Sequence, residues 1–249
     1  MTRNYFGEDV AARYDDPDDE MSQPGAIDPV VDFIARLAGD GAALELGIGT
    51  GRIALPLSQR GVRVCGIDLS EAMVARLQAK QGADAIGVTI GDFATTTVDR
   101  RFAVAYLVFN TIMNLTTQDA QVACFQNAAA HLEPGGCFVI EVMLPDLQRL
   151  PPGETVRPFT VTSTHLGFDE YDIANQGLIS HHFELRDGHY EKSSVPFRYT
   201  WPAELDLMAR LPASHSSTGG ATGTAHHSPA RARSTSRCGA RGEAVLPEG

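Results

Sequence analysis

The 249-residue chain is predicted to adopt an α/β fold, with a doubly wound, mostly parallel sheet, helices on both faces and a small antiparallel β cap inserted after the fifth strand. Three observations predict this fold. Short apolar runs alternate with helical patterns as far as residue 142, and a glycine-rich loop follows the first run. Beyond residue 150, runs of strand-forming residues separated by turn residues predict antiparallel hairpins.

The glycine-rich loop, residues 45–51, reads Glu-Leu-Gly-Ile-Gly-Thr-Gly and follows the apolar run 42–44. Ile53 and Leu57 then begin a helical pattern. Glycines at alternate positions between a strand and a helix let the backbone approach a ligand and make a tight turn. Such a loop presents backbone N–H groups and a helix N-terminus to a small cofactor.

The second predicted strand, residues 62–67, ends at Asp68, and Ser70 caps a helix that continues to about Lys80. An acidic residue about 20 positions after the glycines is placed to accept hydrogen bonds from ribose hydroxyls. These features suit NAD, FAD or S-adenosylmethionine equally. The alternative is a glycine turn and a solvated Asp68 in a doubly wound domain that binds no cofactor.

Three later landmarks distinguish among these cofactors. A third strand at 88–90 runs into Gly-Asp-Phe at 91–93, and a fourth at 102–109 runs into a polar loop at 110–114. A helix at about 117–132 is followed by the turn Glu-Pro-Gly-Gly and a fifth strand at 137–142. This series resembles the class I S-adenosylmethionine-dependent methyltransferases over about residues 5–211. The resemblance implies a Rossmann-like core and a methyl-transfer activity.

The resemblance also implies roles for individual residues. The three loop glycines would approach the methionine part of S-adenosylmethionine, Asp68 would bind the ribose, and Asp92 would accept from the adenine amino group. The full set expected at the cofactor is Tyr14, Glu45, Gly47, Gly49, Gly51, Arg52, Asp68, Leu69, Met73, Asp92, Phe93, Phe109 and Asn110. Ordinary helix packing for Met73 and a core position for Phe93 are the alternatives.

Composition is that of a globular enzyme, with 43% hydrophobic and 20% charged residues. The net charge of −11 argues against a nucleic-acid substrate, which needs a basic face. No apolar run approaches the ~20 residues of a membrane helix, and no signal peptide is recognisable. The four cysteines form no C-x-x-C pair and no metal-ligand cluster. We therefore expect a cytoplasmic monomer or homodimer that acts on a small molecule, without a metal or a membrane partner.

The chain is expected to divide into five parts. Residues 1–40 form a helical segment that covers the cofactor, where Tyr14 either helps to close the site or is only a packing residue. Residues 41–150 form the cofactor-binding core, 151–200 the cap, and 201–211 the return helix. Residues 212–249 are a tail that is rich in Ser, Thr, Gly, Ala and Arg and poor in apolar residues, and it is expected to be disordered.

The predicted cap has strands at 155–171, 178–185 and 189–199, with a hairpin turn at 186–188. Because adjacent strand residues point to opposite faces, only one of His181 and His182 can face the site. Either histidine could instead be structural or solvated. The methyl donor is a sulfonium, so the protein mainly has to align an acceptor atom with the methyl group. That atom is expected to be O or N, with C as a less favoured choice.

A general base is needed if the acceptor must lose a proton, and the candidates are Tyr14, His181, His182 and Glu141. The capped layout resembles the amino-sugar N-methyltransferase branch, whose members tend to carry a histidine in the loop after the fourth strand. Asn114 stands at that position here, which argues against a sugar-amine substrate.

The tail poses a separate question, because the family needs two more strands after the helix that ends at Leu211. Allowed codons for residues 212–230 include a shifted frame that reads as a strand, a turn and a Trp-rich segment. The tail is therefore hypothesised to be a frameshift product, the alternative being a native disordered tail. An altered tail leaves open an inactive cofactor-binding protein, and an NAD(P)-dependent oxidoreductase is a further alternative.

Overall fold

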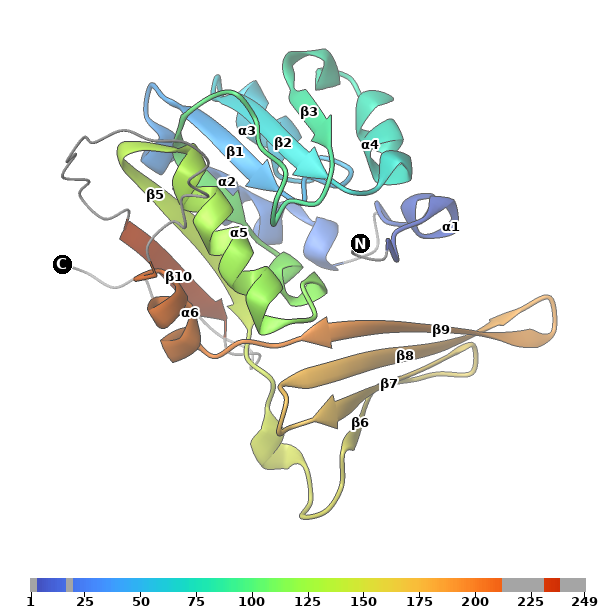
Figure 1. Ribbon diagram of the computed structural model, residues 1–249. Helices are drawn as coiled ribbons and strands as arrows, with labels where there is room; N and C mark the ends of the chain where they lie inside the picture. The colour runs from blue at the N-terminus through green and yellow to red at the C-terminus, as the bar shows by residue number, and fades with distance from the viewer. Residues whose placement is uncertain (1–3, 17–19, 212–230, 238–249) are drawn as a thin grey trace.

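The computed structural model describes residues 4–16, 20–211 and 231–237. At the N-terminal end, α1 (Glu8–Ala11) and the 3₁₀ turn η1 (Glu20–Ser22) precede α2 (Pro24–Ala38). The molecule then has two parts, an α/β core and a four-stranded sheet that projects from one end of it (Figure 1). Within the described residues, no helix is both long enough and apolar enough to cross a membrane.

The core is built on a six-stranded sheet with the order β10-β5-β4-β1-β2-β3, in which every neighbouring pair is parallel. Its strands are β1 (Ala42–Leu46), β2 (Arg63–Asp68), β3 (Gly87–Ile90), β4 (Phe102–Leu107), β5 (Leu132–Met143) and β10 (Arg231–Arg237). The remaining core helices are α3 (Ala54–Gln59), α4 (Glu71–Gln78), α5 (Gln118–His131) and α6 (Pro202–Met208), with 3₁₀ turns η2 (Ala83–Ala85), η3 (Thr111–Asn114) and η4 (Leu147–Arg149). The predicted doubly wound fold is confirmed.

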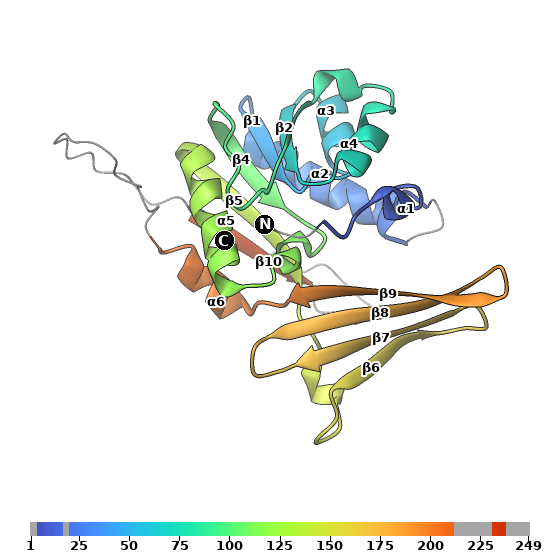
Figure 2. The same ribbon diagram turned by 45° about the vertical axis from the view of Figure 1, so that its right-hand side comes forward.

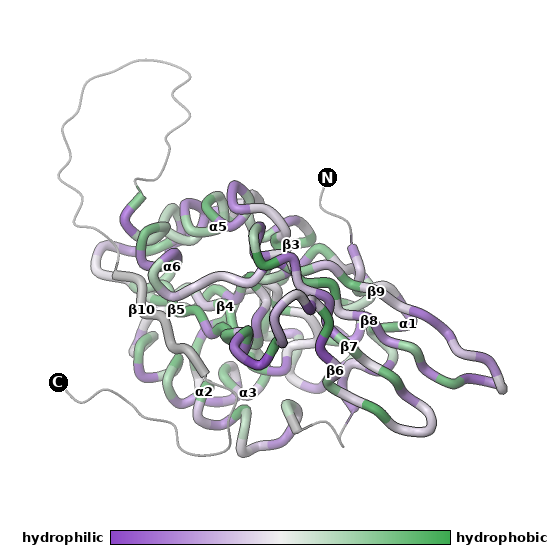
Figure 3. Tube along the Cα trace, turned by 90° about the horizontal axis from the view of Figure 1, so that it is seen from below, coloured by the Kyte–Doolittle hydropathy of each residue, from purple (hydrophilic) through white to green (hydrophobic). Residues whose placement is uncertain are grey.

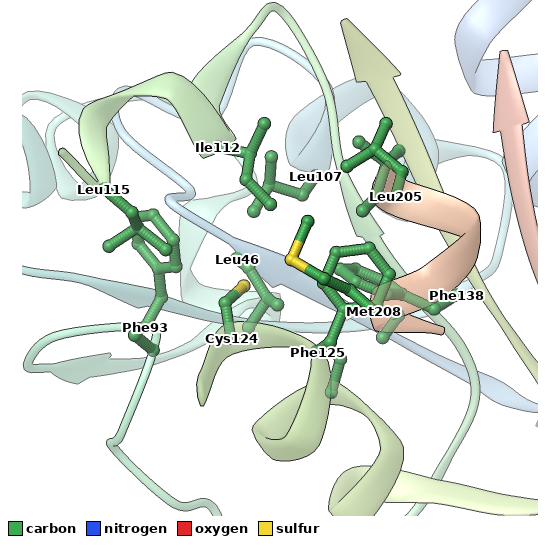
Figure 4. Packing of buried hydrophobic residues seen from close by; sticks show 14 of the residues in the cluster. Leu46, Phe93, Leu107, Ile112, Leu115, Cys124, Phe125, Phe138, Leu205 and Met208 are labelled. Carbon is green, nitrogen blue, oxygen red and sulfur yellow. The ribbon is translucent and has the colours of Figure 1, made fainter. Parts of the chain in front are cut away.

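Two hydrophobic clusters cover the two faces of the sheet. Strand alternation divides them, because Leu44 and Leu46 of β1 belong to one cluster and Ala43 to the other. The first cluster joins the sheet to α5 and α6, and Figure 4 shows Phe125 of α5 against Phe138 of β5. Their ring centroids lie 5.2 Å apart in an edge-to-face arrangement. The second cluster is formed with α2 and α3.

The projecting sheet is the predicted antiparallel cap, with the order β6-β7-β8-β9. Its strands are β6 (Val156–Val161), β7 (His165–Asp172), β8 (Gly177–Arg186) and β9 (His189–Arg198). Both connections to the core lie at one end of the cap, where η4 leads in and β9 leads out to α6 (Figures 1 and 2). Hydrophilic residues mark the tip of the β8–β9 hairpin, and hydrophobic and hydrophilic positions alternate along the strands behind it (Figure 3).

The predicted single strand at 155–171 is wrong, because this stretch is a hairpin formed by β6 and β7. The turn is built by Thr162, whose Oγ1 accepts from the N–H of His165 at 2.9 Å and of Thr164 at 3.3 Å. Such side-chain acceptors stabilise turns even where neither Gly nor Pro is present. In the sequence, this turn is marked by a run of three hydroxyl residues, Thr-Ser-Thr at 162–164. The same residues are compatible with a continuous strand.

Within the tail that the sequence predicts to be disordered, residues 231–237 form β10, which pairs with β5. The register runs from Arg231 opposite Cys137 to Arg237 opposite Met143. Disorder is thus not found for this segment, because the edge of β5 offers a row of backbone groups to which even a polar strand can bond. The other residues of the tail lie outside the described part of the chain.

Candidate functional site

A cavity of about 750 Å³ lies between the core and the cap, where the carboxyl ends of β1 to β4 meet the inner face of the cap sheet. The sheet order reverses between β1 and β4, and this is where open α/β sheets bind their ligands. The lining includes most of the residues expected from the sequence, namely Tyr14, Gly47, Gly49, Asp68, Leu69, Met73, Asp92, Phe93, Phe109, Asn110 and His182.

The glycine loop needs all three glycines, because Gly47, Gly49 and Gly51 have φ values of 77°, 54° and 79°. Gly47 and Gly49 line the cavity. A Cβ on Gly47 would lie 2.6 Å from Cγ2 of Thr111, so a side chain there would press on the cavity wall. Gly51 is not among the lining residues and is instead packed closely against the side chain of Leu77.

Asp68 joins the end of β2 to the glycine loop. Its Oδ2 accepts from the Gly49 N–H at 2.7 Å and its Oδ1 from the Ser70 N–H at 2.8 Å. Burial raises the pKa of Asp68, against the opposing effect of these hydrogen bonds. The carboxylate therefore lies at the cavity wall in an orientation set by backbone donors.

The loop after β3 brings Asp92 and Phe93 to the cavity beside the α4 residue Met73. Asp92 Oδ1 accepts from the Ala94 N–H at 2.9 Å. Asn127 of α5 donates to the Phe93 carbonyl at 2.9 Å and so holds this loop against the core. Phe93 is 8% exposed and belongs both to the hydrophobic cluster and to the cavity wall.

The loop after β4 contains two consecutive non-glycine residues in the left-handed region, Phe109 (φ 53°) and Asn110 (φ 62°). Such conformations persist where surrounding contacts impose them. Here Glu141 Oε2 accepts from the Phe109 N–H at 3.2 Å, and Asn110 Oδ1 accepts from the Met143 N–H. Glu141, expected as a catalytic base, is not a lining residue and instead holds the loop that is.

The N-terminal segment contacts the glycine loop through Tyr14 and Arg52. Arg52 Nη2 donates to the Tyr14 carbonyl at 3.0 Å. Its guanidinium lies 4.9 Å from the centroid of the Tyr14 ring and 5.5 Å from that of Phe109, within cation–π range. Arg52 therefore supports two lining aromatics from behind and does not itself line the cavity. Burial raises the pKa of the Tyr14 phenol, which favours its neutral form.

A second contact fixes the same segment. Asp15 Oδ1 accepts from the Thr50 hydroxyl at 2.6 Å, and Asp15 Oδ2 lies 2.7 Å from Lys80 Nζ. Lys80 also donates to the Thr50 carbonyl at 2.7 Å. The residue after Tyr14 is thus bonded to the loop that carries Gly49 and Gly51, which holds the segment over the cavity.

Glu45, expected at the cofactor, lies beneath the glycine loop and does not line the cavity. Its Oε2 accepts from the Tyr106 hydroxyl at 2.9 Å. Burial raises the pKa of Glu45 to about 8, with the nearby Asp68 charge adding to the effect. Glu45 is therefore a buried support of the loop.

The two adjacent histidines of β8 lie on opposite faces of the cap, as the strand period requires. His182 lines the cavity. The imidazole of His181 is on the other face, with Nδ1 2.8 Å from Ser194 Oγ and Nε2 3.1 Å from Glu170 Oε2. Of the four base candidates, the structure brings only Tyr14 and His182 to the cavity.

Asp169 and Ser180 also line the cavity, and sequence reasoning did not single them out. They sit directly opposite each other on β7 and β8. The available signal was the alternation of polar residues, because Asp169 and His165 share one face of β7 and Ser180 and His182 share the same face of β8. The correct strand register was needed to use it.

The site fits an adenosyl cofactor. Gly47 and Gly49 of the glycine loop, the Asp68 carboxylate at the end of the second strand and Phe93 beside the Asp92 carboxylate after the third strand all line the cavity. The space at Gly47 and Gly49 would be reduced by any Cβ. Fold and site together define a doubly wound protein that binds a nucleoside cofactor at the switch point of its sheet.

Comparison with known proteins specifies the class. A family model described as "Methyltransferase domain" matches residues 43–136. The structure of the CcbJ methyltransferase from Streptomyces caelestis is 35% identical, with a TM-score of 0.72, and the match covers 82% of this chain and 84% of that one. The chain belongs to the class I S-adenosylmethionine-dependent methyltransferases, and S-adenosylmethionine is its cofactor.

More distant matches include a solved structure and a curated sequence. CalS10, an amino pentose methyltransferase from Micromonospora echinaspora with bound S-adenosylmethionine, is 20% identical with a TM-score of 0.61, over 84% of this chain and 89% of that one. A putative methyltransferase of Bacillus subtilis, YqeM, is 29% identical over 127 residues, or 50% of this chain. The match spans about half the length of that curated relative, 51%.

Proposed function

We propose that this protein transfers a methyl group from S-adenosylmethionine to a nitrogen or oxygen of a small molecule. The observation that carries the proposal is a cavity that the glycine loop lines on one side and the cap on the other. One end has the groups that suit an adenosyl cofactor, and the other is roofed by a sheet with polar residues directed inward. A volume of about 750 Å³ is ample for a cofactor and a small acceptor together.

In this proposal the cofactor is held by residues from four strand ends. Gly47 and Gly49 accommodate its methionine part and Asp68 its ribose, while Asp92 and Phe93 bind the adenine.

Other residues complete the enclosure of the cofactor. Leu69 and Met73 complete the adenine wall. The methionyl side is enclosed by Tyr14, Phe109 and Asn110. Glu45, Gly51 and Arg52 act through the loop that they support.

The chemistry divides between cofactor and protein. The sulfonium of the cofactor supplies an activated methyl group. The residues of the chain align the acceptor, exclude water and receive a proton where the acceptor must lose one. Tyr14 serves as a neutral phenol at the closed end of the site. His182 is uncharged in the neutral range because burial and the neighbouring His165 lower the pKa of its imidazole.

Nitrogen is the favoured acceptor. Among the described residues that line the cavity, the charged side chains are Asp68, Asp92 and Asp169, with neither Lys nor Arg. Such a cavity suits a cationic amine better than a phosphorylated or carboxylated substrate. Solved structures of similar fold include proteins described as an amino pentose methyltransferase and a sugar N-methyltransferase, but at 20% and 19% identity they bear on the fold alone, and Asn114 argues against a sugar-amine acceptor.

Calorimetry and a transfer assay test the proposal. S-adenosylhomocysteine is expected to bind the purified protein and NAD is not. Label from methyl-tritiated S-adenosylmethionine is then expected to appear in small molecules of a cell extract that contains the acceptor. Binding of NAD in place of S-adenosylhomocysteine would indicate an oxidoreductase. Cofactor binding without transfer to any small molecule would indicate a cofactor-binding protein without catalysis.

A further inference from the structure

The inner face of the cap carries a connected group of polar side chains, which we call the cap relay: His165, Asp169, Ser180 and His182. His165 Nε2 lies 3.0 Å from His182 Nδ1, and His182 Nε2 lies 3.3 Å from Ser180 Oγ. Ser180 lies directly opposite Asp169 in the strand register and lowers the pKa of that carboxyl, and the Tyr171 hydroxyl donates to Asp169 Oδ2 at 3.4 Å. Three of the four members line the cavity.

One consistent assignment of donors and acceptors satisfies the hydrogen bonds of the cap relay. His165 can donate from Nε2 to Nδ1 of a neutral His182, which then donates from Nε2 to Ser180 Oγ. The Ser180 hydroxyl then keeps its own hydrogen to donate, and directly opposite it in the register stands the carboxylate of Asp169. Both ring nitrogens of His182 are used in this arrangement, so the group left to act on a ligand is the carboxylate at the end of the chain.

The rest of this end of the cavity is apolar. Phe159 and Phe197 from the outer cap strands line it, together with Leu178. The Phe159 ring occupies the space above Gly167, where a Cβ would collide with it. Asp169 is half-buried, and a carboxylate partly enclosed by apolar walls interacts more strongly with a cation than one in bulk water.

We propose that Asp169 binds the ammonium form of the acceptor amine and takes its proton, with Ser180, His182 and His165 as the positioning residues that hold the carboxylate. The proposal rests on the proposed function, and it names the acceptor class as a cationic amine. In the proton step an N–H bond of the ammonium breaks and an O–H bond forms on Asp169. The electron pair of the N–H bond stays on nitrogen as the lone pair that accepts the methyl group.

The electrostatics of the cap support this role. Burial raises the pKa of the Asp169 carboxyl, against the lowering effects of Ser180, Tyr171, His182 and Arg157. A raised carboxyl pKa lies closer to the pKa of an ammonium group, so proton transfer from the ammonium to the carboxylate is easier. Besides burial, four nearby groups shift the pKa of His182, namely His165, Glu184, Asp169 and His181.

A binding experiment tests the proposal without turnover. With S-adenosylhomocysteine saturating, benzylamine and benzyl alcohol are titrated into the protein at neutral pH by calorimetry. Benzylamine is expected to bind roughly tenfold more tightly, the size of one charge-assisted hydrogen bond. Asp169→Asn should abolish this preference and leave benzyl alcohol and S-adenosylhomocysteine binding unchanged. Glu170→Gln, which removes a charge from the opposite face of the same strand, should keep it.

The pH dependence separates positioning from structural support. A protonated Asp169 cannot bind an ammonium, so the preference for benzylamine should be lost as pH falls through the pKa of Asp169. Ser180→Ala removes a donor that lowers this pKa, so it should move the midpoint to higher pH without changing benzyl alcohol binding. An unmoved midpoint would remove Ser180 from the mechanism.

The outcomes distinguish this inference from the proposed function. Equal binding of benzylamine and benzyl alcohol to the unaltered protein, or a preference that survives Asp169→Asn, overturns the role of Asp169 alone. A protein that fails to bind S-adenosylhomocysteine overturns the proposed function itself. Unchanged S-adenosylhomocysteine affinity in Asp169→Asn shows that the variant is folded.

Discussion

Gly47 illustrates how much of this site depends on backbone conformation at single residues. Its φ of 77° lies in the left-handed region, and its missing Cβ leaves space beside Thr111. The same loop rests on Glu45, a buried carboxyl whose hydrogen bond to Tyr106 fixes it below the loop. At the residue scale, the shape of the cavity depends on the missing Cβ of Gly47 and on the buried carboxyl of Glu45.

Gly47→Ala should therefore weaken S-adenosylhomocysteine binding by more than about tenfold and destabilise the fold by roughly 1–2 kcal/mol. Calorimetry and urea unfolding measure the two effects. Gly61→Ala is the matched control, because Gly61 has φ 89° and a Cβ added there would meet nothing within 4 Å. It should lose similar stability and keep cofactor affinity. Equal affinity in the two variants would contradict the role given to Gly47.

The raised pKa of Glu45 predicts that the stability of the fold depends on pH. Its pKa rises from 4.5 to about 8 on folding, so between these values the folded protein binds more protons than the unfolded chain. The stabilisation due to the neutral carboxyl is complete below pH 4.5 and is lost as pH rises to about 8. Glu45→Gln should flatten the decline in unfolding free energy between about pH 5 and pH 8. Urea unfolding at both pH values measures this, with exposed Glu154→Gln as the control that should leave the decline unaltered.

At the scale of elements, the site is assembled by segments that do not belong to the sheet. The N-terminal segment is bonded to the glycine loop through Asp15, Thr50 and Lys80. The cap contributes the opposite wall through β6 to β9. Arg13 lies 3.5 Å from Glu184 of β8, so the N-terminal segment contacts both parts. That ion pair is exposed and contributes little stability by itself.

Asp15→Ala should release the N-terminal segment from the loop. Because Asp15 bonds the loop and not the cofactor, we expect S-adenosylhomocysteine affinity to fall by about tenfold while the thermal midpoint changes little. Calorimetry and a thermal melt give the two values. Asp9→Asn alters an exposed carboxylate of the same segment and should affect neither. A large loss of thermal stability in Asp15→Ala would show that the segment supports the fold and not the site.

At the scale of the whole molecule, the sheet edge is the point of interest. β10 covers β5 with seven residue pairs in parallel register. Without β10, β5 would be an open edge, which is a template for association between chains. The hypothesis that the tail arose by a frameshift stays a prediction, and resequencing the coding DNA tests it. Bases that read cleanly through residue 212 in this and related genes would refute it.

Truncation measures what β10 contributes. A chain that ends at Leu211 should melt several degrees lower and aggregate more readily than one that ends at Arg237, because only the second retains β10. Differential scanning calorimetry and light scattering compare the two. If the tail is a frameshift product, the full chain is expected to have low stability or low activity, and a melt well within the ordinary mesophilic range would count against low stability. Identical melts for the two truncated chains would exclude a stabilising role for β10.

Local patterns predict most of the core and half of the site. Glycines between a strand and a helix, and Asp92-Phe93 after a short strand, identify themselves by spacing, because the geometry that they serve is made within a few residues. Glu141 and Arg52 are expected from the sequence to act at the ligand, and they instead support the loops that line the cavity. Whether such a side chain lines the cavity or supports a loop from outside depends on the strand face or loop position from which it projects. Sequence spacing does not encode that direction.

The cap is the least predictable part. The hairpin at 162–164 escapes prediction because Thr-Ser-Thr carries no Gly or Pro, and an error in register hides which residues share a face. With the register known, His165, Asp169, Ser180 and His182 fall on one face and His181 on the other.

The sequence by itself determined the fold class, the methyltransferase family and the cofactor, since these follow from short-range glycine, acid and aromatic spacings. Only the tertiary structure decided which polar groups of the cap face the cavity, that β10 lies at the sheet edge, and that Glu45 is buried. The physical reason is that burial and facing depend on contacts between segments as distant as β1 and the cap. No local pattern can specify such contacts before the chain has folded.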